Sequence, residues 1–164
     1  MSTLLPAFGG VGFTLIAFVV CLSIIVFIHE YGHYIVGRWS GIHAEVFSIG
    51  FGPVLFARVD RRGTVWQVAA IPVGGYVRFK GDKGAASDAD TRALNDMDVA
   101  ERRATMQGAP LWARASTAAA GPVFNFILSL ILFCGLSISK GVTKNPLTVG
   151  QVYDVPQVSE VQEI

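Results

Sequence analysis

The chain has 164 residues, of which 52% are hydrophobic and only 15% are charged, and its mean hydropathy is +0.50. Because soluble domains usually carry about 25% charged residues, this composition argues against an ordinary soluble domain and indicates a membrane protein. The formal net charge is +1 and the sequence contains no basic stripe with interleaved aromatic residues, so we expect no nucleic-acid partner.

The first predicted element is a transmembrane helix within residues 1–37. No charged side chain occurs in residues 1–28, and the run over residues 11–28 is long enough for about 27 Å of helix. Arg38 and Trp39 then supply a cation and an interfacial aromatic ring, which are typical of the end of a span. A secretory signal peptide is the alternative, but neither a basic start nor a small-residue cleavage site is present.

Short β-branched and aromatic runs predict a membrane-associated β-sheet over residues 38–80. The DRRG sequence at residues 60–63 predicts a hairpin turn between two of these runs. Residues 81–110 are polar and rich in Ala, Asp and Gly, which predicts a cytoplasmic linker with one short helix around residues 98–106.

The second predicted transmembrane helix occupies residues 111–139. Its uncharged run, residues 115–139, is bounded by Arg114 and Lys140 and is long enough to cross a bilayer with some tilt. Pro122 should bend this helix or mark its first turn, because proline cannot donate a backbone hydrogen bond.

The distribution of basic residues predicts the orientation of the chain. Of the 13 Lys and Arg residues, 11 lie in residues 34–114, between the two spans. Basic loops face the cytoplasm. The expected fold is therefore an α-helical membrane protein in which two transmembrane helices flank a cytoplasmic β-hairpin segment.

The HEYGH sequence at residues 29–33 matches the H-E-x-x-H pattern of zinc hydrolases. On a helix, His29 and His33 lie about 40° apart around the axis and about 6 Å along it, so both imidazoles can bind one zinc ion. Glu30 is placed beside such an ion, as the general base for a water molecule. His29 lies about 13.5 Å of helix from Arg38, and burying a carboxylate at such depth costs about 2.5–3.5 kcal/mol, which a metal would compensate.

A chance match and a hydrogen-bonded structural pair are the alternatives to this zinc site. A third protein ligand is also required. The metzincin pattern would put it at Trp39, which excludes that class. His43 and Glu45 are weaker candidates, since both follow the predicted end of the span. We therefore expect the ligand set in these 164 residues to be incomplete.

Four motifs in order, HEYGH, FSIGFGP at residues 47–53, IPVGGYV at 71–77 and AAGPVFNF at 119–126, resemble the site-2 protease family of intramembrane zinc metalloproteases. The nearest branch is the bacterial regulator of sigma-E protease group, which has periplasmic PDZ domains. The resemblance covers nearly the whole chain but only the front portion of such a protein. It implies that residues 140–164 begin a PDZ domain.

The resemblance also implies roles for individual residues. His29 and His33 would bind zinc and Glu30 would be the catalytic acid and base, while the third ligand would be an aspartate of an LDG motif that this chain lacks. The segment Gly50, Phe51 and Gly52 would lie near the active site and receive an extended substrate, unless these glycines only form turns.

Asn125 projects an amide into the second span. It could hydrogen-bond to the substrate backbone or to the transition-state oxygen, or it could bridge two helices as Asn often does in membranes. The sequence leaves the substrate-binding role and the structural role open.

The leading hypothesis is an intramembrane zinc endopeptidase that cleaves single-span membrane proteins such as anti-sigma factors. The expected location is the bacterial inner membrane, with a multi-pass chain and an active site toward the cytoplasm. The alternative is a non-catalytic membrane scaffold that presents a strand edge and a PDZ domain. A metal transporter is not favoured, because no polar residue occurs between Ser23 and His29.

Overall fold

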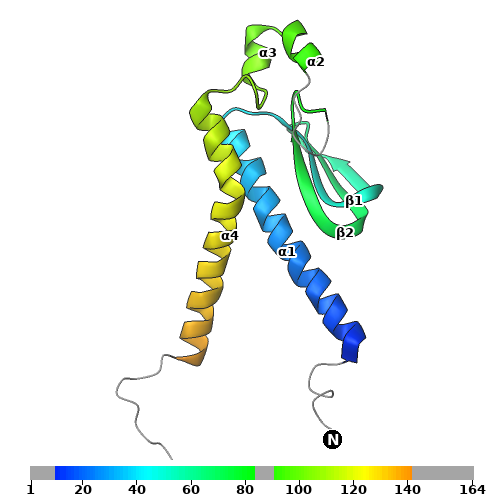
Figure 1. Cartoon of the computed structure of the whole chain (residues 1–164), viewed down its shortest axis with the longest axis vertical. Coiled ribbons are helices and arrows are strands. Elements are labelled where there is room, and N and C mark those ends of the chain that lie inside the picture. The colour runs from blue at the N-terminus through cyan, green and yellow to red at the C-terminus, as the bar shows by residue number, and fades with distance from the viewer. Residues whose placement is uncertain (1–9, 84–90, 142–164) are drawn as a thin grey trace, which may run out of the picture. The chain divides into compact units, whose positions relative to one another are not determined.

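The computed structural model describes residues 10–83 and 91–141, and only the backbone of residues 91–93. The described elements are α1 (Gly10–Trp39), β1 (Ala44–Val59), β2 (Val65–Phe79), α2 (Thr91–Asp96), α3 (Val99–Arg103) and α4 (Leu111–Lys140), which follow one another in Figure 1. One compact unit ends at Leu130 and a second begins at Ile131. The candidate site lies entirely in the first unit. The predicted start of a PDZ domain falls almost entirely outside the described residues.

Helices α1 and α4 confirm the two predicted long apolar helices. Each has 30 residues, and by length and composition both are sufficient to cross a membrane. Their apolar side chains are largely uncovered, as in Phe18, which is 63% exposed. Pro122 lies in the interior of α4 rather than in its first turn. Since proline has no N–H, the carbonyl of Ala118 lacks its usual helical partner.

Strands β1 and β2 form an antiparallel hairpin, and the predicted turn at residues 60–63 is confirmed by the hydrogen bond from Gly63 N–H to Asp60 O at 3.1 Å. The hairpin is strongly bent, so residues 46–49 of β1 pair both with residues 65–68 and with residues 75–78 of β2. The bend in β1 lies at Gly50 and Gly52, whose φ angles of 87° and 85° favour glycine. The short strand runs predicted within residues 38–80 are therefore paired segments of two long strands.

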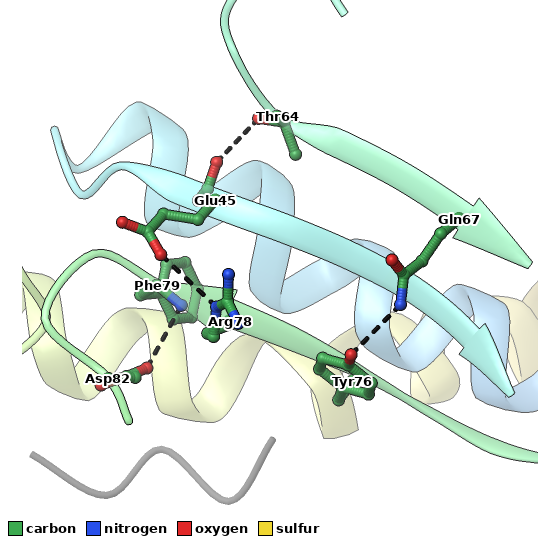
Figure 2. Close-up of polar contacts among 8 residues, drawn as sticks. Glu45, Thr64, Gln67, Tyr76, Arg78, Phe79 and Asp82 are labelled. Carbon is green, nitrogen blue, oxygen red and sulfur yellow. Dashed lines mark hydrogen bonds and ion pairs between the residues drawn. The ribbon is translucent and has the colours of Figure 1, made fainter. Parts of the chain in front are cut away.

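Polar side chains cross-link these segments, as Figure 2 shows. The amide of Gln67 donates to the hydroxyl of Tyr76 at 3.2 Å, although these residues belong to opposite halves of β2. Directly after the hairpin turn, the Thr64 hydroxyl donates to the carbonyl of Ala44, the first residue of β1, at 2.8 Å. These contacts hold the bent hairpin together without the exposed apolar residues of β1 that follow the bend.

An aromatic cluster attaches the base of the hairpin to the last turns of α1. Phe47 is fully buried, stacks on Trp66 with ring centroids 4.3 Å apart, and meets Tyr34 and Phe27 of α1 edge-on at 5.7 Å. Aromatic pairs of this kind contribute about 0.5–1.5 kcal/mol each beyond burial of their area. The cluster therefore fixes β1 and β2 beside the turn of α1 that carries Glu30.

The second half of the segment predicted as a linker packs onto the hairpin. Asp98 caps α3 by accepting a hydrogen bond from Glu101 N–H at 2.7 Å, within the region expected to hold one short helix. The turn after α3 is anchored by the hydrogen bond from His43 N–H to Ala104 O at 2.9 Å, and Thr105 is fully buried. This packing brings Met106 to the site described below.

The hairpin turn depends on one carboxylate. Partial burial would raise the pKa of Asp60, but hydrogen bonds from the N–H groups of Thr64 and Arg62 and from Trp66 and Tyr34 outweigh it and lower that pKa. Because Asp60 accepts all four of these bonds, it joins the turn, β2 and α1.

We expect Asp60→Ala to destabilise the first unit by about 1 kcal/mol, the net value of a lost hydrogen bond or two. A lowered folded-state pKa stabilises the fold above the ordinary pKa of 3.8, and this contribution disappears as pH falls through the folded-state pKa. Thermal unfolding in detergent between pH 7 and pH 3 would measure both effects. An unfolding temperature that depends on pH equally in Asp60→Ala and in the unsubstituted protein would contradict the assignment.

Candidate active site

His29 and His33 lie one turn apart on α1, and Glu30 directly follows His29. The two imidazole rings have centroids 4.8 Å apart. The Nδ1 atom of His33 is 2.7 Å from the carbonyl oxygen of Thr117 in α4. A carbonyl can only accept, so Nδ1 carries the proton and donates it. In the neutral imidazole, the lone pair of His33 is therefore on Nε2, the atom that is free to bind a metal.

The Nε2 atoms of both histidines converge on one small residue of α4. A Cβ atom built at Gly121 would lie 2.7 Å from His29 Nε2 and would also overlap His33 Nε2. Glycine therefore leaves open the position at which the two lone pairs can meet. Helix α1 can come this close because Gly32 has no side chain either, since a Cβ there would lie 2.7 Å from the carbonyl oxygen of Ala120.

Two convergent imidazole nitrogens suit a zinc ion, which binds histidine in tetrahedral sites. Within the described part of the chain, no third His, Cys, Asp or Glu completes a metal-binding group with them. Of the two weaker candidates, His43 lies near Gly63 and Glu45 forms an ion pair with Arg78 at 3.4 Å. The residues present therefore fit two ligands of a zinc site.

Glu30 faces the hairpin rather than α4. A Cβ built at Gly75 would lie 3.3 Å from Glu30 Cγ and 2.7 Å from the Ser48 carbonyl oxygen, so only glycine allows β2 this close. The backbone N–H of Val77 donates a hydrogen bond to the Glu30 carboxylate. Glu30 opens into a cavity of about 340 Å³, whose other lining residues are His33, Gly75, Tyr76, Val77, Phe79, Met106, Thr117 and Ala118.

Asn125 lies against His29 on the other side of the site. Its Nδ2 atom is 3.1 Å from His29 Nδ1, so the side chain joins α4 to α1. The Oδ1 atom is buried and has no hydrogen-bond partner among the described residues. The contact is a bridge between two helices, and its partner in α1 is a predicted zinc ligand.

The segment Gly50, Phe51 and Gly52 approaches the site only indirectly. The ring of Phe51 stacks on Tyr76 with centroids 6.0 Å apart, and Tyr76 lines the cavity that contains Glu30. A Cβ at Gly50 would lie 2.6 Å from the Ile71 carbonyl oxygen, so this glycine permits the tight pairing at the bend.

Three residues of the site were not predicted from the sequence: Gly75, Thr117 and Gly121. Gly75 and Gly121 lie inside the quoted motifs IPVGGYV and AAGPVFNF, which was the available signal. Their importance comes from contacts with α1, and local patterns do not reveal which helix face meets which strand.

Known proteins resemble this chain over most of its length. Residues 17–162 match the family model of peptidase family M50. A protein of Agrobacterium fabrum whose name describes a zinc metalloprotease is 47% identical over 163 residues, which are 99% of this chain and 41% of that protein. A similarly named protein of Rhizobium meliloti is 52% identical over 124 residues, 76% of this chain and 33% of its own length.

Metalloprotease MmpA of Caulobacter vibrioides is 44% identical over 146 residues, which are 84% of this chain and 37% of that protein. The chain thus spans well under half the length of these curated relatives. The family match, in contrast, extends over most of the chain and includes the HEYGH helix, both strands and α4. The chain therefore belongs to peptidase family M50, the site-2 protease family of zinc metalloproteases.

Proposed function

We propose that the full-length protein is an intramembrane zinc metalloendopeptidase of regulated intramembrane proteolysis, which cleaves single-span membrane proteins such as anti-sigma factors. The observation that carries the proposal is the convergence of His29 Nε2 and His33 Nε2 beside Gly121, with Glu30 one residue along the same helix. An aspartate from the rest of the protein would supply the third ligand.

The proposed location is the bacterial inner membrane, with the active site toward the cytoplasm. It is supported by the bacterial relatives and by the 11 of 13 basic residues that lie between the two long helices. The part of β1 that follows the bend also suits contact with a bilayer, because Leu55 and Phe56 are 71% and 64% exposed.

The proposed chemistry is peptide hydrolysis. His29 and His33 would hold the zinc ion, which would supply the Lewis acidity needed to activate water and to polarise a peptide carbonyl. Glu30 accepts a proton from the water molecule as the water oxygen attacks the carbonyl carbon. Glu30 then donates that proton to the leaving amide nitrogen as the C–N bond breaks. Water reaches Glu30 through the cavity of about 340 Å³ that the hairpin and Met106 line.

The substrate must be extended before its amides can be attacked, because a helix holds them in internal hydrogen bonds. We assign substrate contact to Gly50, Phe51 and Gly52. This role is supported by the stacking of Phe51 on Tyr76, next to Glu30. Asn125 joins α4 to His29, and we assign the amide atom on the side away from His29 to hydrogen bonding with the substrate backbone.

The proposal is tested on the full-length protein purified in detergent. We expect one zinc ion per chain by elemental analysis, cleavage of a tagged single-span substrate, and loss of cleavage on chelation with recovery on return of zinc. A non-catalytic scaffold would instead contain no stoichiometric zinc and leave the substrate intact. That result would reject the proposed function.

A further inference from the structure

The contact between Asn125 and His29 has a chemical consequence for the zinc site, and this inference rests on the proposed function. His33 has its Nδ1–H committed to the Thr117 carbonyl at 2.7 Å, so its Nε2 lone pair is available. His29 needs the same tautomer if its own Nε2 atom is to bind the ion near Gly121. The group beside His29 Nδ1 decides which tautomer forms.

That group is the side-chain amide of Asn125, 3.1 Å away. An amide presents a donor on one side and an acceptor on the other, and rotation by 180° about the Cβ–Cγ bond exchanges them without moving another residue. With the NH₂ group toward Nδ1, the ring proton of His29 would be on Nε2 and would block ligation. With Oδ1 toward Nδ1, the ring donates Nδ1–H and Nε2 keeps its lone pair.

We propose that Asn125 is a positioning residue for zinc: its Oδ1 atom accepts the Nδ1–H of His29 and thereby holds the Nε2 lone pair toward the position beside Gly121. The two histidines are then held in the same way, each by an oxygen acceptor on α4, from Thr117 and from Asn125. One helix thus provides both acceptors and, at Gly121, the space between them.

The test compares Asn125→Asp with Asn125→Leu in the full-length protein, and measures zinc affinity by competition with a chromophoric chelator. Asp can only accept and keeps the bond to His29, so we expect zinc affinity equal to or above that of the unsubstituted protein. Leu has a similar size and no acceptor, and we expect a loss of about 10- to 100-fold, the usual effect of removing such a partner. Ser129→Ala, one turn further along α4, is the matched control, because Ser129 lines the same pocket as Asn125 and His29, and it should leave zinc affinity unchanged.

A second readout separates positioning from helix bridging. In protein loaded with Co²⁺, Asn125→Leu should shift the visible absorption bands and Asn125→Asp should not, while the unfolding temperatures of the metal-free proteins stay similar. A tenfold or greater loss of zinc affinity in Asn125→Asp, or full affinity in Asn125→Leu, would overturn the inference. Absence of zinc from the unsubstituted protein would instead reject the proposed function, so the two failures are distinguishable.

Discussion

Replacement of Glu30 by Gln in the full-length protein is expected to reduce cleavage of a single-span substrate by about 100- to 10,000-fold, the range that a general acid–base group contributes. Gln keeps the size of the side chain and its polar contact with the hairpin at Val77, but it cannot accept and return a proton. Zinc content should stay at one ion per chain, because Glu30 faces the hairpin and the two histidine Nε2 atoms face Gly121.

Glu45→Gln provides the matched control for this substitution. Glu45 lies on β1 and forms an ion pair with Arg78 at 3.4 Å, outside the cavity that contains Glu30. The control should cleave at the rate of the unsubstituted protein. Normal cleavage by Glu30→Gln would show that another group transfers the proton, and loss of zinc from Glu30→Gln would show that Glu30 supports metal binding.

The predicted elements agree with the structure where a single property determines them. Uncharged apolar runs predicted the two long helices. The DRRG sequence predicted the hairpin turn, which hydrogen bonds to Asp60 hold in place. The short strand runs predicted within residues 38–80 are joined into β1 and β2, because the glycines at the bends let each strand turn while its backbone pairing continues. Residues 46–49 pair with both halves of β2, and this double pairing depends on tertiary contacts. The alternation of apolar and polar residues along a strand does not specify such contacts.

The candidate site, too, is predictable from the sequence only in part. Helical spacing was enough to bring His29 and His33 together, because both lie on one element. The groups that orient them come from α4, 84 and 96 residues further along the chain. Asn125 was predicted as a polar residue of the second span, but its partner depends on the rotation and depth of two packed helices. No local pattern specifies either quantity.

The second large effect is expected from adding one methyl group at Gly121. In Gly121→Ala the new Cβ atom would lie 2.7 Å from His29 Nε2 and would overlap His33 Nε2, at the position where the two lone pairs meet. The rings must then turn away or the helices must separate. Because loss of an orienting partner alone costs about 10- to 100-fold in metal affinity, displacement of two ligands should cost about 100-fold or more. Cleavage should fall in parallel with zinc occupancy.

Gly135→Ala on the same helix separates this steric effect from a general effect of helix propensity. Both substitutions replace a helical glycine by alanine, a change that alone favours the helix by about 1 kcal/mol. Among the described residues, however, a Cβ built at Gly135 would meet nothing within 4 Å beyond its chain neighbours and the backbone of its own helix. Gly135→Ala should therefore keep full zinc affinity and full cleavage, and Gly121→Ala should lose both while it remains folded by circular dichroism. Zinc affinity in Gly121→Ala within threefold of that in Gly135→Ala would mean that the two histidines do not bind an ion at this position, and the proposed active site would have to be placed elsewhere.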